Sequence, residues 1–190
     1  MTASKNTIRS ERMRRTLIRV ARNEFATKGF AGTSTPEIAA AAEVSRGALY
    51  HHFTDKAALF QAVVEHERAE VAASIQAAIA GVGEPFETIV LGGEAYLEAL
   101  RDPGRRRIML IDGPAVLGDT AFRDMDTRYT ARALEASIAN AIAAGTMRPL
   151  PVLATTNLLT AAYDRAAFAD GDAGDYITAL RGIIEGLALR

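Results

Sequence analysis

The chain has 190 residues, 49% of them hydrophobic, which is enough for one large domain or for a small domain joined to a larger one. It contains no cysteine, which excludes disulfides, thiol catalysis and cysteine-based zinc sites. The net charge is only −1, but residues 1–56 hold ten Lys and Arg against five Asp and Glu, whereas the remainder holds 12 (22 less 10) against 18 (23 less 5). A basic end attached to an acidic remainder indicates contact with a polyanion; a basic solvated tail is the alternative.

The composition also predicts the structural class. Ala, Leu, Ile, Glu and Arg are abundant and there are only six prolines, which favours an all-helical protein. The first 15 residues are polar and basic with no apolar run after them, so no secretory leader is expected. No apolar stretch reaches the length of about 18 residues that a membrane span needs. We therefore expect a soluble cytoplasmic protein.

Residues 9–28 have the pattern of an amphipathic helix. Apolar residues including Leu17, Ala21 and Phe25 recur at helical spacing, and Gly29 is a typical residue just past a helix end. This apolar face is expected to pack on the segment that follows.

That segment, residues 33–56, predicts two short helices and the start of a third. Ser34 can cap the first helix, with Glu37 completing a capping box, and Ser45 can cap the second. The second helix is only about two turns long and cannot be stable alone, so Leu49 and Phe53 must anchor it while its polar residues stay outside. A short braced helix with hydrogen-bonding side chains is what reading the DNA major groove requires, and the pattern is a helix-turn-helix.

From Gly29 to Leu59 the chain spells G-F-A-G-T-S-x-x-x-I-A-x-x-A-x-V-S-x-G-x-L-Y-x-H-F-x-D-K-x-x-L. This order resembles the N-terminal domain of the TetR/AcrR family of bacterial transcription regulators, over about the first third of the chain. One departure is Glu43, where the family usually has glycine in the turn. If the backbone there is left-handed, a residue other than glycine costs about 1–2 kcal/mol.

The resemblance implies a set of DNA contacts. Arg46 would bind guanine, Tyr50 and His51 would reach phosphates, and a partial core role is the alternative for Tyr50. A homodimer would read a palindromic operator. The implied DNA-binding residues are Thr33, Ser34, Ser45, Arg46, Gly47, Ala48, Tyr50, His51 and Lys56.

The remaining residues predict further helices. Asp55 can cap a long helix over 56–80, and glycines near Pro85 then mark a domain boundary. Helices are expected over 86–100, from 119 or 120 to 144, over 152–169 and over 176–189. We thus expect about nine helices: a helix-turn-helix domain at 9–56 (motif 34–53), a connecting helix at 56–80, and a regulatory and dimerisation domain at 81–190.

The second domain is the expected site of a small apolar effector and of self-association. The last two helices, about 152–189, have wide apolar faces, and the resemblance implies that they pair with a second copy in a four-helix bundle. Plain core packing is the alternative for every candidate effector contact. These candidates are Tyr96, Leu100, Met109, Asp112, Phe122, Tyr129 and Tyr163.

No motif for catalysis is present. HExxH, P-loop and GxGxxG patterns are missing and there are only three histidines, so we expect no enzyme activity, no cofactor and no metal site. The expected function is a sequence-specific repressor released by its effector. One alternative is a small-molecule carrier whose head does not read DNA. Another is an architectural DNA-binding protein, against which the low total charge argues.

Overall fold

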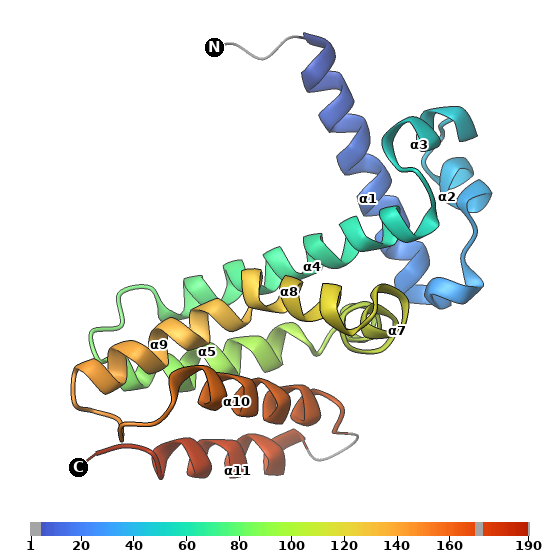
Figure 1. Ribbon diagram of the computed structural model, residues 1–190. Helices are drawn as coiled ribbons and strands as arrows, with labels where there is room; N and C mark the ends of the chain where they lie inside the picture. Colours follow the sequence, from blue (N-terminus) through green and yellow to red (C-terminus); the bar gives the residue numbers. More distant parts are fainter. Residues whose placement is uncertain (1–4, 170–172, 190) are drawn as a thin grey trace. The chain divides into compact units, whose positions relative to one another are not determined.

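The computed structural model describes residues 5–169 and 173–189, and it confirms the all-α class (Figure 1). Within these residues the extended structure is a single bridge between Met147 and Ala188. None of the described helices combines the length and apolar character that crossing a membrane requires. The helices are α1 (Lys5–Gly32), α2 (Thr35–Ala41), α3 (Arg46–His52), α4 (Lys56–Ile79), α5 (Pro85–Ala99), α6 (Pro103–Arg106), the π-helix η1 (Arg107–Asp112), α7 (Gly113–Leu117), α8 (Asp119–Tyr129), α9 (Ala131–Ala143), α10 (Val152–Ala167) and α11 (Ala173–Glu185).

The chain forms two compact units that do not follow chain order. The first unit comprises residues 1–67 together with 103–122, and the second comprises residues 68–102 together with 123–190. Helix α4 therefore begins in the first unit and ends in the second. The segment 103–122, which the sequence places in the regulatory half, packs with the first helices.

The first unit has an aromatic core. The rings of Phe25 and Phe60 meet edge to face with centroids 5.0 Å apart, and Phe30 lies 5.1 Å from Phe60. Ile38 of α2 and Leu49 of α3 are fully buried, so both short helices are anchored, as their sequence predicts. In Figure 1 these two helices lie beside α1. Gly29, at φ 75°, breaks α1 where a helix end was predicted, and one further turn follows.

The segment 103–122 is held to α1 by polar contacts. The apolar run 108–118 within it suggests a buried helix end and a loop, but the segment forms α6, η1 and α7 in succession. The carboxylate of Asp112 accepts a hydrogen bond of 2.9 Å from the Phe30 backbone N–H. Arg107 donates to the Thr27 carbonyl at 3.0 Å. These bonds join η1 to the end of α1 and fix where the loop before α2 begins.

A buried carboxylate adds a third helix to this assembly. Glu67 of α4 is 2% exposed and accepts from the Nε of Arg22 at 3.2 Å and from the Nε of Arg105 at 2.8 Å. The sequence favours a solvated face with one internal ion pair in the run 105–107; Arg105 pairs with Glu67, and Arg107 also lies 3.8 Å from Asp112. Glu67, Arg22 and Arg105 thus form a clamp between α4, α1 and α6.

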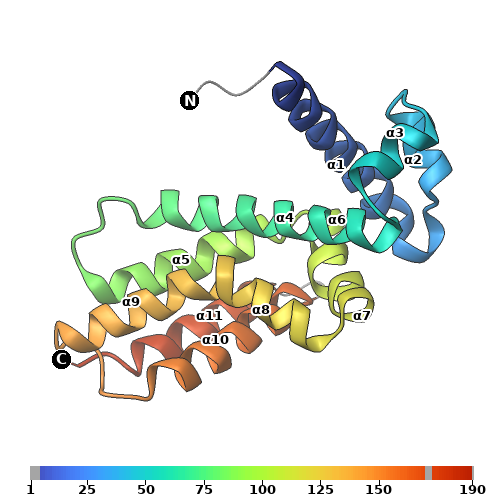
Figure 2. The same ribbon diagram turned by 45° about the horizontal axis from the view of Figure 1, so that its top comes forward.

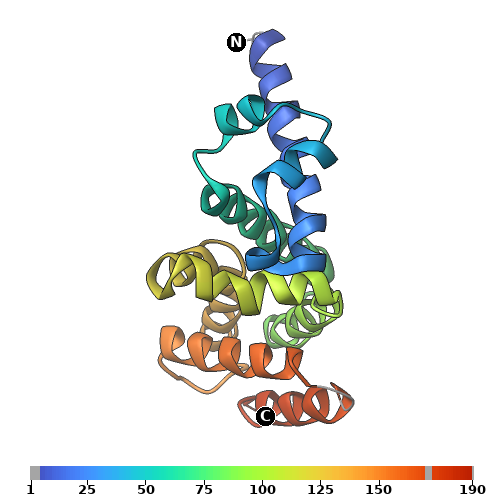
Figure 3. The same ribbon diagram turned by 90° about the vertical axis from the view of Figure 1, so that its right-hand side faces the viewer.

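The second unit is a helical bundle in which α9 packs on α5 and α10, and α11 lies beside α10 (Figures 2 and 3). Ile89, Ile138 and Ile184 are among its buried core residues. After α9, Gly145 adopts φ 71°, the left-handed backbone that suits glycine just past a helix end. The bridge between Met147 and Ala188 then links this turn to the residues that follow α11.

The single helix predicted from 119 or 120 to 144 is wrong, because α8 ends at Tyr129 and α9 begins at Ala131. The break coincides with a buried cation. Arg68 is 2% exposed, pairs with the Asp126 carboxylate, and donates to the Thr130 hydroxyl at 3.1 Å. A buried guanidinium must be paired and hydrogen-bonded, and Asp126 of α8 and Thr130 at the break are its partners here.

Candidate nucleic-acid interface and pocket

Helix α3 presents a row of exposed groups. The Ser45 hydroxyl caps the helix by accepting from the Ala48 N–H at 3.1 Å, and Leu49 anchors it with 1% exposure. With that anchor inside, the outward positions are Ser45, Arg46, Gly47, Tyr50 and His51, and Ala48 is half-buried. Hydrogen-bonding side chains with a glycine among them, on a capped helix end, can approach base edges and phosphates closely.

Tyr50 belongs to this exposed row rather than to the core. Its side chain is 43% exposed, and its hydroxyl lies 3.0 Å from the hydroxyl of Thr35. That hydrogen bond, together with Arg46, lowers the pKa of the phenol. Thr35 thus orients the phenol from α2.

The start of α2 carries the predicted capping box. Glu37 accepts from the Ser34 N–H at 2.9 Å, while the Ser34 hydroxyl accepts from the Glu37 N–H at 3.5 Å. The Ser34 hydroxyl and backbone, followed by Lys28, lower the pKa of Glu37 to about 2. Ser34 is half-buried, so it stays partly accessible beside α3.

Two of the expected phosphate contacts have internal partners. Thr33 is 3% exposed and its hydroxyl donates to the Gly29 carbonyl at 2.8 Å, so this hydroxyl is not presented to a phosphate. The Lys56 ammonium donates to the carbonyls of Phe30 at 2.8 Å and Thr33 at 3.0 Å, and it lies 4.1 Å from the Phe30 ring centroid. Lys56 therefore ties the loop before α2 to α4, with one of its three protons left for a phosphate.

The turn between α2 and α3 has the left-handed backbone that the usual glycine would suit. Glu43 adopts φ 55°, and it is the described residue other than glycine with positive φ. The motif keeps its geometry with a strained residue in the turn.

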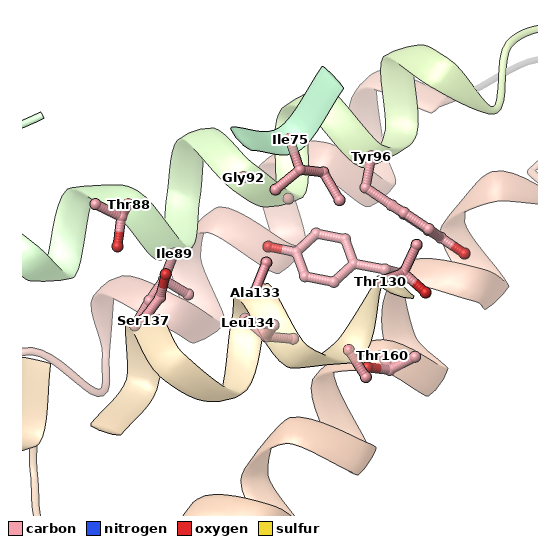
Figure 4. A pocket seen from close by; sticks show the side chains of 13 residues that line it. Ile75, Thr88, Ile89, Gly92, Tyr96, Thr130, Ala133, Leu134, Ser137 and Thr160 are labelled. Atoms are coloured by element: carbon pink, nitrogen blue, oxygen red, sulfur yellow. The ribbon is translucent and has the colours of Figure 1, made fainter. Parts of the chain in front are cut away.

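The second unit contains a pocket between α4, α5, α9 and α10. Together with its opening to solvent, it contains about 450 Å³ of space not occupied by atoms. Figure 4 shows side chains from α5, α9 and α10 around it. The lining residues are mostly apolar or hydroxyl-bearing: Ile75, Thr88, Ile89, Gly92, Gly93, Tyr96, Thr130, Ala131, Ala133, Leu134, Ser137, Thr160 and Tyr163.

Some of these hydroxyls have protein partners. Tyr96 donates to the Asp164 carboxylate at 2.5 Å, and Figure 4 shows its hydroxyl turned away from Thr88 and Ser137. Burial, and then the Asp164 charge, raises the pKa of Tyr96 well above its usual value. Thr88 donates to the Pro85 carbonyl at 2.6 Å. Tyr96 and Thr88 therefore offer the pocket mainly their carbon surfaces.

Close packing of one glycine shapes the pocket wall. A Cβ atom on Gly93 would lie 1.9 Å from the Tyr163 hydroxyl oxygen. The sequence suggests that the Gly92–Gly93 pair kinks the helix or allows a close contact, and the structure shows the contact. Burial, with the nearby charge of Glu94, raises the pKa of Tyr163 to about 12, so its phenol is protonated at neutral pH.

The candidate effector residues do not form one cluster. Tyr96 and Tyr163 line the pocket, and the other five do not. Leu100 and Met109 are buried core residues, and Asp112 is bonded to the Phe30 backbone in the first unit. Phe122 lies against Gly113. Tyr129 is half-buried outside the lining.

Sequence reasoning missed the hydroxyl residues Thr88, Ser137 and Thr160. A single aromatic residue can be recognised in a sequence as a candidate ligand contact, whereas single Ser and Thr residues in helices are too common to stand out. The signal that could have found them is helical spacing to another lining residue, as in Thr88–Gly92, Ala133–Ser137 and Thr160–Tyr163.

Comparison with known proteins adds to this geometry. Residues 17–63 match the family model described as bacterial regulatory proteins of the tetR family. Residues 86–189, more than half of the chain, match the model described as tetracyclin repressor-like, C-terminal domain. The chain belongs to the TetR family. The resemblance drawn from Gly29 to Leu59 is thereby confirmed.

Individual TetR-family relatives cover the chain to different extents. A TetR-family transcriptional regulator from Pectobacterium atrosepticum has a solved structure that is 32% identical, covers 99% of both chains and gives a TM-score of 0.81. The A-factor receptor protein of Streptomyces griseus is 28% identical over 113 residues, and the regulator AcrR of Shigella flexneri is 41% identical over 63 residues. These matches span only 39% and 29% of the two curated relatives.

Proposed function

We propose that this TetR-family protein is a homodimeric transcriptional repressor that a small ligand releases from a palindromic operator. The observation that carries the proposal is the exposed face of α3, where Arg46, Tyr50 and His51 project from a helix anchored by Leu49. Arg46 can donate to two acceptors of guanine, and Tyr50 and His51 can donate to phosphates. Ser45 and Gly47 allow close approach, and Ser34 and Lys56 add phosphate contacts.

Exposed apolar surface on the last two helices supports a dimer. Leu158 of α10 is 73% exposed and Ile183 of α11 is 58% exposed. Between the exposed positions of α11, Gly182 has no atom within 4 Å of where a Cβ would stand. A glycine inside a helix costs about 1 kcal/mol relative to alanine, and a second helix approaching closely would account for it.

The pocket supports the regulatory part of the proposal. A ligand can shift a conformational equilibrium only by as much as its affinities for the two states differ. The ligand must therefore bind the conformation released from DNA more tightly, by several kcal/mol for a complete switch.

The test is fluorescence anisotropy with the DNA upstream of the gene, a shuffled duplex and two salt concentrations. We expect the native duplex to bind about 10³-fold more tightly, with affinity falling as salt rises. Arg46→Ala should weaken native binding by about 1–3 kcal/mol, whereas Arg101→Ala, at an exposed arginine of the second unit, should leave it unchanged.

Equal weak binding to all duplexes selected from the genome would contradict the proposal. If ligand binding then remained, the protein would be a carrier. The dimer has its own test by analytical ultracentrifugation: Leu158→Glu should give monomers, and Ala73→Glu, at an exposed position of α4, should not.

A further inference from the structure

We infer that the pocket of the second unit selects a neutral, largely apolar molecule that carries at least one hydroxyl or carbonyl oxygen, held by Ser137 and Tyr163. This inference rests on the proposed function, because it names the class of ligand for the same regulator. Among the residues that line the pocket there is no Asp, Glu, Lys, Arg or His. A charged ligand group would be buried there without a counterion, which is costly.

Hydroxyl groups without protein partners give the pocket its polarity. Ser137 and Tyr163 are each 6% exposed, and within the described residues neither hydroxyl makes a hydrogen bond. Thr160 has no such bond either and is half-buried. These side chains line the pocket and the described residues give their hydroxyls no partner, so a ligand there is free to supply one. A hydroxyl both donates and accepts, which suits an alcohol, a phenol or a ketone.

The remaining wall limits size and shape. At the ~30 Å³ that a water molecule occupies in the liquid, 450 Å³ corresponds to at most about 15 non-hydrogen atoms. Ile75, Ile89 and Leu134 supply apolar surface, and Gly92, which has no side chain, takes up no space in the pocket. Tyr96 adds a ring whose own hydroxyl is taken by Asp164. A compact ligand with one polar edge therefore fits this pocket.

Three probes of one shape test this inference: naphthol, naphthalene and naphthoate. Titration calorimetry on the full chain at pH 7 measures each Kd. We expect naphthol to bind about tenfold more tightly than naphthalene, through its hydrogen bond, and at least tenfold more tightly than naphthoate. The inference is overturned if naphthoate binds as tightly as naphthol, or if naphthol does not bind.

Variants show whether the named hydroxyls carry the selectivity. The double variant Ser137→Ala, Tyr163→Phe should bring the naphthol and naphthalene constants within about twofold. The matched control is Ser74→Ala, Tyr176→Phe, which removes the same two groups from residues outside the lining. It should keep the tenfold preference. An unchanged preference in the pocket variant would contradict the assignment.

Operator release, measured in parallel by anisotropy, separates this inference from the proposed function. Naphthol that binds calorimetrically without displacing DNA would count against the ligand-released repressor and leave the ligand class intact. Displacement by naphthoate, undiminished in the double variant, would keep the repressor and overturn the ligand class.

Discussion

The two units differ in one use of polar side chains, although both contain bonded polar groups such as the pair Arg68–Asp126 of the second unit. In the first unit Glu67, Asp112 and Lys56 are each bonded to other helices or loops, so the elements behind α3 are tied together. In the second unit Ser137 and Tyr163, whose side chains line the pocket, have hydroxyls that make no hydrogen bond within the described residues. The first arrangement suits a surface that must hold its shape against DNA. The second leaves hydrogen-bonding capacity for another molecule.

Glycines sharpen the same comparison. A Cβ on Gly29 would lie 2.7 Å from the Arg107 guanidinium, and one on Gly93 would lie 1.9 Å from the Tyr163 hydroxyl. In the first unit, the absence of a Cβ at Gly29 leaves room for the Arg107 side chain, which donates a hydrogen bond to the Thr27 carbonyl. In the second unit, the absence of a Cβ at Gly93 leaves room for the Tyr163 phenol at the pocket wall.

Removing the buried carboxylate should have the largest effect on stability. Glu67→Gln leaves Arg22 and Arg105 without their common anion, and breaking a buried pair costs about 3–5 kcal/mol. Both guanidinium groups are partly exposed, at 23% and 19%, so we expect the lower end, about 3 kcal/mol, in urea unfolding. The control is Glu70→Gln, at an exposed position of the same helix, and it should change stability by less than about 0.5 kcal/mol. Equal effects of the two substitutions would mean that the clamp does not stabilise the unit.

Neighbouring glycines of α5 should respond with opposite signs. Gly93→Ala forces the buried Tyr163 ring to move and should destabilise by about 1–3 kcal/mol. At Gly92 a Cβ would meet Ile75 at 3.5 Å, an ordinary contact, so Gly92→Ala should stabilise by about 0.5–1 kcal/mol. Thermal unfolding of both variants measures the difference. A stabilising Gly93→Ala would show that the phenol is not confined there.

The strained turn of the helix-turn-helix offers a smaller gain. Glu43→Gly should stabilise the protein by about 1 kcal/mol, because glycine adopts φ 55° without the Cβ clash. Glu43→Ala removes the same side chain and keeps the strain, so it should be nearly neutral. If both variants behave alike in urea unfolding, the turn stores no strain.

The smallest effect is a pH dependence confined to the first unit. The pKa of Glu37 is lowered from 4.5 to about 2, so the folded state binds this proton less readily than the unfolded state. The stabilisation is complete above the ordinary pKa of 4.5 and is lost as the pH falls toward 2. Glu37→Gln should flatten the stability profile over this range, measured by chemical unfolding at a series of pH values. The steeper slope should persist in Glu70→Gln.

Local signals predicted the first unit well and the second only in outline. Capping residues, the Gly29 stop and the apolar anchors Leu49 and Phe53 act within a few residues of the elements that they define. The break at Thr130 coincides with a hydrogen bond from Arg68, 62 positions away, and periodicity within the segment does not reveal it, so the sequence predicted α8 and α9 as one helix. The pocket likewise needs α5, α9 and α10 to meet. Asp112 shows the limit most clearly: it was assigned to an effector site, but its partner is the Phe30 backbone.

The return of residues 103–122 to the first unit has a consequence for building hybrid regulators. A head cut after residue 67 would keep Glu67 but lose Arg105, and would keep the Phe30 amide but lose the Asp112 carboxylate. Grafting this head onto another effector domain therefore requires transplanting two separate stretches of sequence. The receiving protein must accept the second stretch between its own helices, so exchangeable parts in this protein are defined by packing and not by a single splice point.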